Sequence, residues 1–232
     1  MLSVITCSNR PDKLKLAQDS LSKQTYKDFE WLVVSPVDPK VGKWVKDPPK
    51  GKNDLYCLNK AVNAGIKAST GDLLVLLQDS IWIQPDALEK FAFHFKTNPE
   101  AFVSGVGDQY DQLDDNGKPC HKVWLDPRKR SDMGSYYECL PQDWETNFCS
   151  LPRKAIYDVG GWDEEMDIYY AWDNVAVAIR LVQFGYKPYL DQTNESFTLK
   201  HGRSADWDEN VWSNHDIAGF LKTRPIKLEY LG

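Results

Sequence analysis

Residues 59–88 read NKAVNAGIKASTGDLLVLLQDSIWIQPDAL, and this stretch decides the fold. Val62 and Ile66 continue a helical spacing of apolar residues that begins near residue 54, and Gly71 ends the turn after it. The next five residues, 73–77, are all apolar, which is typical of a strand buried on both faces of a sheet. Pro85 then opens a second helix. The stretch therefore predicts a helix, a central strand and another helix of an α/β protein.

The residues before this stretch continue the same alternation. We expect a strand over 2–7, a helix over 11–24 and a strand over 30–34. Residues 36–52 contain four prolines and five lysines, so we expect a loop there. The order of elements predicts an open α/β sheet, Rossmann-like and mixed, with helices on both faces. In such sheets ligands bind at the carboxyl ends of the strands, here residues 6–10, 35–38 and 78–80.

The second half of the chain is less regular. Residues 105–138 are polar and rich in turn residues, so we expect loops or an edge hairpin. A helix is predicted over 173–184, with Gly185 as its stop signal.

Composition limits the class of protein. The chain has 232 residues, 42% of them hydrophobic, which suits one domain with a sizeable core. Its net charge of −6 argues against non-specific coating of nucleic acid. No apolar run approaches the roughly 18–20 residues of a transmembrane helix, and no signal peptide is visible. The five cysteines form no CxxC pair, so we expect reduced thiols and a cytoplasmic location.

Asp79 carries the first chemical prediction. A carboxylate at the end of a buried strand can bind a divalent cation that carries a diphosphate, because hard cations prefer oxygen ligands. The alternative is an aspartate that only begins a turn.

Three blocks of sequence resemble the family 2 glycosyltransferases. The first is residues 59–88, in which seven positions fall in register with the family pattern: Asn63, Gly65, Gly71, Asp72, Asp79, Pro85 and Asp86. Residues 3–34, SVITCSNRPDKLKLAQDSLSKQTYKDFEWLVV, resemble the opening of the family, and residues 159–187, VGGWDEEMDIYYAWDNVAVAIRLVQFGYK, resemble the segment that carries its Glu-Asp motif. The resemblance implies one GT-A domain, with a nucleotide-sugar half over 1–104, an acceptor and catalytic half over 105–204, and a tail over 205–232.

The resemblance also implies roles for residues on the donor side. Asp79 and the late histidine His201 would bind Mn²⁺ or Mg²⁺, although Gln78 and Ser80 stand where the family usually has two aspartates. His201 could instead be an ordinary surface histidine, and Arg10 an ordinary surface ion-pair residue. Ser35-Pro36 replaces the Asp-Asp pair that the family places against the nucleoside. The residues expected at the nucleotide-sugar are Thr6, Ser8, Arg10, Ser35, Asp38, Asn63 and Gln78.

On the acceptor side, the family's Glu-Asp motif aligns with Asp173-Asn174. This makes Asp173 the expected catalytic base, with a helix-capping role as the alternative. Asp163 and Glu164 are candidates for a second base or for the acceptor site. Because aromatic faces pack on sugar rings, we expect one or two residues of a sequence cluster to line the acceptor site; its members are Trp144, Asn147, Trp162 and Trp172, with Glu145 beside them.

The sequence therefore predicts an inverting glycosyltransferase that uses a nucleotide diphosphate-sugar, with a uridine diphosphate-sugar expected first. The acceptor hydroxyl stays open between a carbohydrate, a lipid-linked phosphate and a nucleic acid. Basic residues gather in 40–52 and 118–130. They suggest an anionic polymer or modified DNA as the acceptor, or they belong only to solvated loops. A nucleotidyltransferase is disfavoured because the loop TCSNRPDKL has no glycine. The alternative from another class is a non-catalytic binder of sugar-nucleotides or glycans.

Overall fold

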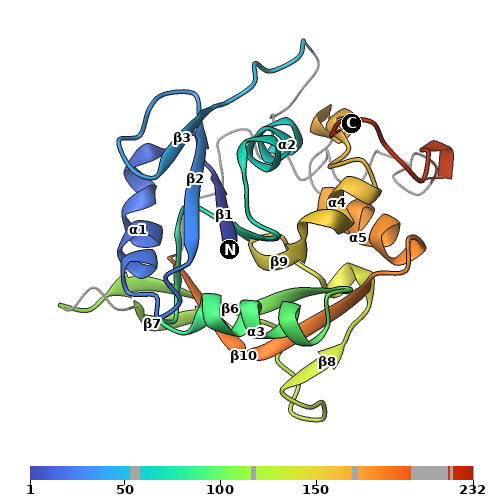
Figure 1. Cartoon of the computed structure of the whole chain (residues 1–232). Helices are drawn as coiled ribbons and strands as arrows, with labels where there is room; N and C mark the ends of the chain where they lie inside the picture. The colour runs from blue at the N-terminus through green and yellow to red at the C-terminus, as the bar shows by residue number, and fades with distance from the viewer. Residues whose placement is uncertain (53–57, 116–118, 169–171, 200–218, 220–221, 232) are drawn as a thin grey trace.

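The computed structural model describes residues 1–52, 58–115, 119–168, 172–199, 219 and 222–231. Within them, ten strands form one mixed sheet in the order β3-β2-β1-β4-β9-β6-β10-β5, with β7 beside β6 and β8 beside β10 (Figure 1). The strands are β1 (Leu2–Cys7), β2 (Phe29–Ser35), β3 (Lys43–Lys46), β4 (Leu73–Leu77), β5 (Ile81–Ile83), β6 (Ala101–Leu113), β7 (Pro119–Trp124), β8 (Tyr136–Glu138), β9 (Phe148–Pro152) and β10 (Lys187–Leu199). The helices are α1 (Leu14–Ser22), α2 (Leu58–Ala68), α3 (Ala87–Thr97), α4 (Arg153–Asp158) and α5 (Asp173–Gln183). Short 3₁₀ turns span Pro11–Lys13, Pro141–Asp143 and Glu164–Ile168.

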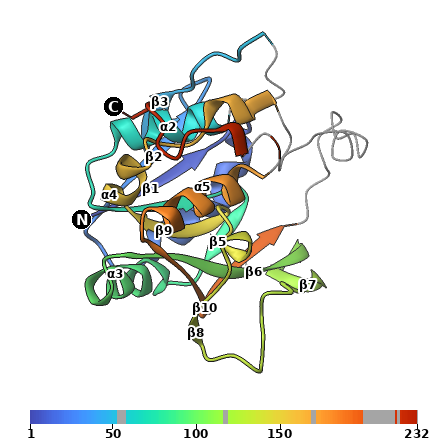
Figure 2. The same cartoon turned by 90° about the vertical axis from the view of Figure 1, so that its right-hand side faces the viewer.

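The apolar run of β4 is explained by two hydrophobic cores, one on each face of the sheet. Leu74 and Leu76 belong to the core that α2, α4 and α5 cover. Leu73, Val75 and Leu77 belong to the core under α1 and α3. The two groups of helices lie on opposite sides of the strands in Figures 1 and 2. A strand with alternate side chains in two cores must be apolar at every position, as the sequence predicted.

The directions of the strands place several segments at one edge of the sheet. β1, β2 and β4 run parallel, while β9 is antiparallel to both β4 and β6. The carboxyl ends of β1, β2 and β4 therefore meet the amino end of β9. Ser8, Ser35, Asp79 and Asn147 all lie at this edge, which we call the carboxyl edge.

The structure corrects the loop that we predicted at residues 36–52, and within 105–138 it confirms the edge hairpin that we gave as an alternative to loops. Residues 43–46 form β3, which pairs with β2 through backbone hydrogen bonds that its lysine-rich sequence does not reveal. Residues 105–113 belong to the long strand β6, which forms a hairpin with β7 at one end and pairs with β9 and β10 elsewhere. The boundary that we predicted between residues 104 and 105 lies inside β6.

The C-terminal segment 222–231 packs against the turn after α4. Leu228 N–H donates to the carbonyl of Val159, and Tyr230 N–H donates to the carbonyl of Gly160. Leu228 and Leu231 are both buried. Figure 1 shows this end of the chain beside α4. The predicted tail therefore contributes to the fold along these ten residues.

No helix in the described ranges has the length and apolar character to cross a membrane. The cysteines that the structure describes, Cys7, Cys120, Cys139 and Cys149, are free thiols, in keeping with the predicted reduced state. Cys57 lies outside the described residues.

Candidate active site

Asp79 lies at the centre of the carboxyl edge, directly after β4. Its side chain is 5% exposed, and both carboxylate oxygens accept hydrogen bonds. Ser8 Oγ donates to Oδ2 at 2.7 Å, while Arg10 donates from Nη2 to Oδ1 at 2.9 Å and from Nε to Oδ2 at 3.3 Å. Arg10 is 40% exposed, so its guanidinium spans from a buried carboxylate to solvent. Three residues predicted for the donor side are thus brought together.

The described residues alone do not form a divalent-cation site. Asp79 offers one carboxylate, and its two oxygens are already engaged by Arg10 and Ser8. Among the described residues, no group of three or more His, Cys, Asp or Glu side chains could hold a metal ion. His201, the second predicted ligand, lies outside the described residues. Cation binding through Asp79 and His201 therefore stays a prediction.

The other residues predicted to bind the nucleotide-sugar differ in how far their side chains are exposed to solvent. Thr6 and Ser35 are fully buried, and Thr6 Oγ1 accepts a hydrogen bond from Trp31 Nε1 at 3.0 Å. Their side chains cannot contact a donor, which corrects both predictions. Gln78 and Asp38 are exposed, and Asp38 is paired with Lys40 at 2.7 Å. At this edge, Gln78 is the accessible neighbour of Asp79.

Asn63 has a structural role instead of the predicted ligand contact. It is 1% exposed. Its amide donates to the carbonyl of Trp162 and to the carboxylate of Glu164, and its oxygen accepts from Trp162 N–H. These bonds fix the segment after Gly161 onto α2, because both lie on the same face of the sheet.

Asp163 is likewise committed to the fold. Arg180 donates to Oδ2 at 2.9 Å, and Arg224 donates to both carboxylate oxygens at 2.8 and 2.7 Å. The Asp163 side chain is 1% exposed. A carboxylate that is buried between two guanidinium groups, with both oxygens accepting hydrogen bonds from them, cannot reach an acceptor hydroxyl, which corrects its assignment as a base.

Two hydrogen bonds to backbone carbonyl groups connect the Asp79 region to the start of α5. Gln78 N–H donates to the carbonyl of Asn147 at 2.9 Å. Three residues earlier, the carbonyl of Trp144 accepts a hydrogen bond from Asn174 Nδ2 at 3.1 Å. Residues 144–147 therefore connect the segment that contains Asp79 to the start of α5, where Asp173 precedes Asn174.

Asp173 has the properties of a proton acceptor. Its side chain is partly exposed, and desolvation raises its pKa, against the opposing effect of its own N–H and that of Asn174. The preceding residue, Trp172, has φ 71°, a left-handed conformation that is costly for a residue with a large side chain. Backbone strain of this kind concentrates at functional sites, and Trp172 itself is 41% exposed.

The four predicted acceptor residues separate into two groups. Trp144 is fully buried and Trp162 is 1% exposed, and both lie in the core beneath α4 and α5. Neither ring has a face free for a sugar, so both predictions are corrected. Asn147 and Trp172 are exposed and remain candidates.

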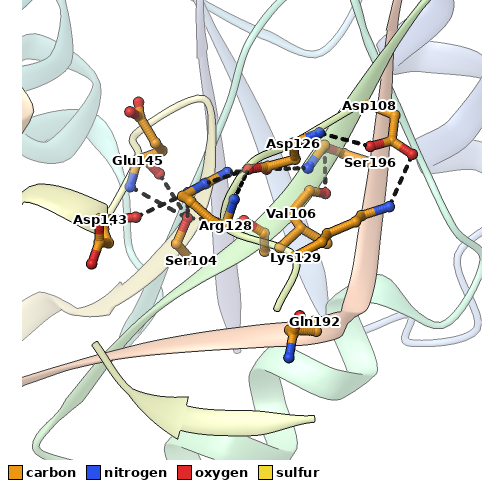
Figure 3. A network of polar contacts seen from close by, with 12 residues as sticks. Ser104, Val106, Asp108, Asp126, Arg128, Lys129, Asp143, Glu145, Gln192 and Ser196 are labelled. Carbon is orange, nitrogen blue, oxygen red and sulfur yellow. Dashed lines mark hydrogen bonds and ion pairs between the residues drawn. The ribbon is translucent and has the colours of Figure 1, made fainter. Parts of the chain in front are cut away.

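A buried network beside the site was missed by the sequence prediction (Figure 3). Arg128 donates from Nε and Nη2 to the two oxygens of Asp126, at 3.0 and 2.6 Å. Lys129 bridges Asp108 and Glu195 at 2.9 and 2.7 Å. The sequence contained no signal for these pairs, because the residues come from β6, β10 and the loop after β7.

The same ion pairs change the interpretation of the basic run 128–130. Arg128 and Lys129 are neutralised by buried carboxylates, and Arg130 pairs with Asp132 at 2.7 Å. Each cation thus has a partner on this chain, which does not favour the predicted patch for an anionic polymer or DNA.

The class that this fold defines is the GT-A type: a mixed α/β sheet with helices on both faces and an aspartate directly after a central strand. A solved structure of the same fold is that of S. aureus TarS 1–349 in complex with UDP, with a TM-score of 0.62 at 12% identity over 86% of this chain and 60% of that one. Residues 54–159 match the model of "Glycosyl transferase family 2". The sequence is thus similar to the family 2 glycosyltransferases, as its motifs predicted.

Two curated relatives are similar over most of this chain. One is a glucosyl-dolichyl phosphate glucuronosyltransferase of Haloferax volcanii, 23% identical over 70% of this chain and 56% of the relative. The other is an uncharacterized glycosyltransferase, YwdF, of Bacillus subtilis, 24% identical over 73% of this chain and 64% of the relative. The chain thus spans less than two thirds of the length of either.

Proposed function

We propose that this protein transfers a sugar, with inversion, from a nucleotide diphosphate-sugar to a hydroxyl group of a carbohydrate acceptor. The observation that carries the proposal is the Asp79–Arg10–Ser8 cluster at the carboxyl edge, linked through Gln78 and Asn147 to the segment that holds α5. Arg10 in this cluster suits a diphosphate, and Asp173 at the start of α5 suits the proton of an acceptor hydroxyl. Residues 144–147 connect the two.

Arg10 is the donor-side residue in this proposal. Its guanidinium lies at the ends of β1 and β4, where ligands of open α/β sheets bind, and it is partly exposed. A planar guanidinium binds phosphate oxygens through two parallel hydrogen bonds. Ser8 and Asp79 keep it in place, so it meets the diphosphate without a rotamer search.

Asp173 is the acceptor-side residue. Its carboxylate accepts the proton of the attacking hydroxyl as the oxygen forms a bond to the anomeric carbon. The bond between that carbon and the diphosphate oxygen breaks at the same time, and the nucleoside diphosphate leaves with the electron pair. Attack from the face opposite the leaving group inverts the anomeric configuration. No step in this scheme is assigned to a metal ion.

The similar TarS structure was solved with UDP, and the curated Haloferax relative acts on a sugar carried by dolichyl phosphate. These names support a uridine diphosphate-sugar as the donor and a sugar hydroxyl as the acceptor.

The experiment is to measure release of nucleoside diphosphate from a panel of uridine, guanosine and thymidine diphosphate-sugars, with Mn²⁺, Mg²⁺ or EDTA. Turnover of at least one donor, lost in Asp79→Ala, supports the proposal. Folded protein that binds UDP and turns over no donor supports the non-catalytic binder instead. The EDTA arm tests the separate prediction of a cation at Asp79 and His201.

A further inference from the structure

The segment 143–147 is held to its surroundings by its backbone, and the first anchor is Arg128. Arg128 Nη1 donates to the carbonyl of Asp143 and to Ser104 Oγ, both at 3.0 Å. Ser104 Oγ in turn accepts from Glu145 N–H and donates to the Glu145 carbonyl, both at 3.3 Å (Figure 3). Arg128 itself is fixed by the buried Asp126. The main chain on both sides of Trp144 is therefore fixed to β6 and to the loop after β7.

Two further anchors complete this clamp. Asn174 Nδ2 donates to the carbonyl of Trp144, and Gln78 N–H donates to the carbonyl of Asn147. Glu145 lies between them. Its main chain is thus positioned relative to α5 on one side and to the end of β4 on the other.

The side chain of Glu145, unlike its backbone, has no hydrogen-bond partner among the described residues. It is partly buried, and within the described residues its carboxylate accepts no hydrogen bond. Figure 3 shows the carboxylate pointing away from Arg128 and the network that holds its main chain. Leaving a partly desolvated carboxylate without a hydrogen-bond partner is costly, whereas the backbone around it is unusually well fixed. This combination is expected of a side chain held ready for a ligand.

The charged groups around Glu145 come from several elements. Desolvation raises its pKa, Arg128 opposes this, and the carboxylates of Asp126, Asp173 and Asp143 raise it further. Asp173 is therefore close enough to act on Glu145 electrostatically. Asn174 contributes no charge, because its side chain is a neutral amide; it donates to the carbonyl of Trp144.

We propose that Glu145 and Asp173 form the carboxylate pair of the acceptor site, in which Glu145 positions the acceptor and Asp173 takes the proton. This inference rests on the proposed function. A carboxylate only accepts hydrogen bonds, so Glu145 requires a donor group on the acceptor next to the hydroxyl that attacks. The acceptor class is therefore a sugar with neighbouring free hydroxyl groups, and Glu145 decides which of them faces Asp173.

The first test measures the pair without turnover. The carboxyl carbon of Glu145 is titrated by NMR in protein labelled with ¹³C-glutamate, and its resonance is assigned from Glu145→Gln. We expect its midpoint to move to lower pH in Asp173→Asn, while the midpoint of Glu138, an exposed glutamate on β8, stays unchanged. An unchanged Glu145 midpoint would overturn the pair.

The second test separates positioning from proton transfer. With a uridine diphosphate-sugar that the wild type turns over, Glu145→Gln should leave donor hydrolysis by water near normal. It should lower transfer to a panel of methyl hexosides by about tenfold or more, mainly through a higher KM. Asp173→Asn should lower both reactions, and Glu138→Gln should lower neither.

An equal loss of hydrolysis and transfer in Glu145→Gln, or no loss of transfer, would overturn the positioning role. If the wild type releases no nucleoside diphosphate from any donor, the proposed function fails. The NMR titration then still decides whether Glu145 and Asp173 form a pair.

Discussion

At Asp173, burial and the start of helix α5 have opposite effects on the pKa of the carboxyl group. Desolvation raises its pKa, whereas the backbone N–H groups of Asp173 and Asn174 favour the charged form. The net rise brings the group closer to the pH at which a base works best, which a merely capping aspartate does not need.

This predicts a specific pH profile. A base must be deprotonated to act, so wild-type turnover should rise with pH through the raised pKa of Asp173 and then level off. Asp173→Asn should bind UDP as the wild type does, but lose about 10²- to 10⁴-fold in turnover together with this limb. Steady-state kinetics from acid to neutral pH measure it. Near-normal turnover in Asp173→Asn would move the base to another residue.

Arg10 gives the second prediction at this scale. Arg10→Ala removes the guanidinium that pairs with Asp79 and should weaken UDP binding by about tenfold or more, because charge-assisted hydrogen bonds to the diphosphate are lost. Lys15→Ala is the control, because Lys15 is a mostly exposed cation paired with Asp19 on α1. Calorimetry with UDP measures both. Equal affinities for the wild type and Arg10→Ala would place the nucleotide elsewhere.

Some of the site residues could be predicted from the sequence and others could not. Asp79, Arg10 and Ser8 were predicted together because strand ends in a parallel sheet converge. Trp144 and Asp163 were predicted wrongly because a residue type alone does not reveal burial. Glu145 was named only as a neighbour, since its anchors lie on β6, α5 and the end of β4.

At the scale of elements, the turn after α4 receives the C-terminal segment. Gly160 has φ +79°, and a Cβ there would lie 1.5 Å from the carbonyl oxygen of Leu228. Gly185 has φ +94°, with nothing within 4 Å of its Cβ position. The two glycines share a backbone conformation that side chains rarely adopt and differ in the space around them.

Alanine substitutions at Gly185 and Gly160 can therefore distinguish the cost of backbone strain from the cost of a steric clash. Gly185→Ala should cost about 1 kcal/mol of unfolding free energy from strain alone. Gly160→Ala should cost about 2 kcal/mol more and should expose the C-terminal segment to proteolysis, because that segment must move away. Urea unfolding and limited proteolysis measure these effects. Equal costs at the two sites would show that the segment is not packed on Gly160.

The loop after β7 offers a matched pair of aspartates. Burial by itself would raise the pKa of Asp126, but hydrogen bonds from Arg128 and Gly107 lower it below its usual value. Asp132 forms a similar pair with Arg130 at the surface. The buried pair should therefore matter to stability and the exposed pair should not.

Asp126→Asn should cost about 3–5 kcal/mol at neutral pH, because Arg128 is left largely buried without its counter-charge. Because the folded-state pKa of Asp126 is lowered, its contribution is present above the unfolded-state value and is lost as pH falls through the folded value. The difference from wild type should shrink in acid. Asp132→Asn should show no measurable change in urea unfolding. If Asp126→Asn also left the free energy of unfolding unchanged, the stabilising role of the Asp126–Arg128 pair would be contradicted.

Strand pairing marks the limit of sequence prediction at this scale. β4 was predicted at its observed bounds, because both of its faces are buried and its composition shows this. β3 was predicted as a loop, because it is largely exposed and held by backbone hydrogen bonds to β2. Residues 105–113 were expected as loops or part of an edge hairpin, and the long strand β6 was not predicted, since a strand lined with polar network residues lacks apolar alternation.

For the molecule as a whole, the proposed function depends on which edge of the sheet binds the nucleotide. The carboxyl edge holds Arg10, Asp79 and Asp173. The opposite edge has a cavity of about 890 Å³, lined by Asp72, Arg153 and Tyr157 among others. There the guanidinium of Arg153 contacts Ser69 Oγ and lies 5.2 Å from the centre of the Tyr157 ring, so this cavity is the competing site for a nucleotide.

The most direct test is a crystal structure of the protein soaked with a uridine diphosphate-sugar. We predict that the diphosphate lies within hydrogen-bond distance of Arg10, with the anomeric carbon facing the space between Asp173 and Glu145. A nucleotide bound in the cavity at Arg153, or a diphosphate out of reach of Arg10, would contradict the proposed transferase site.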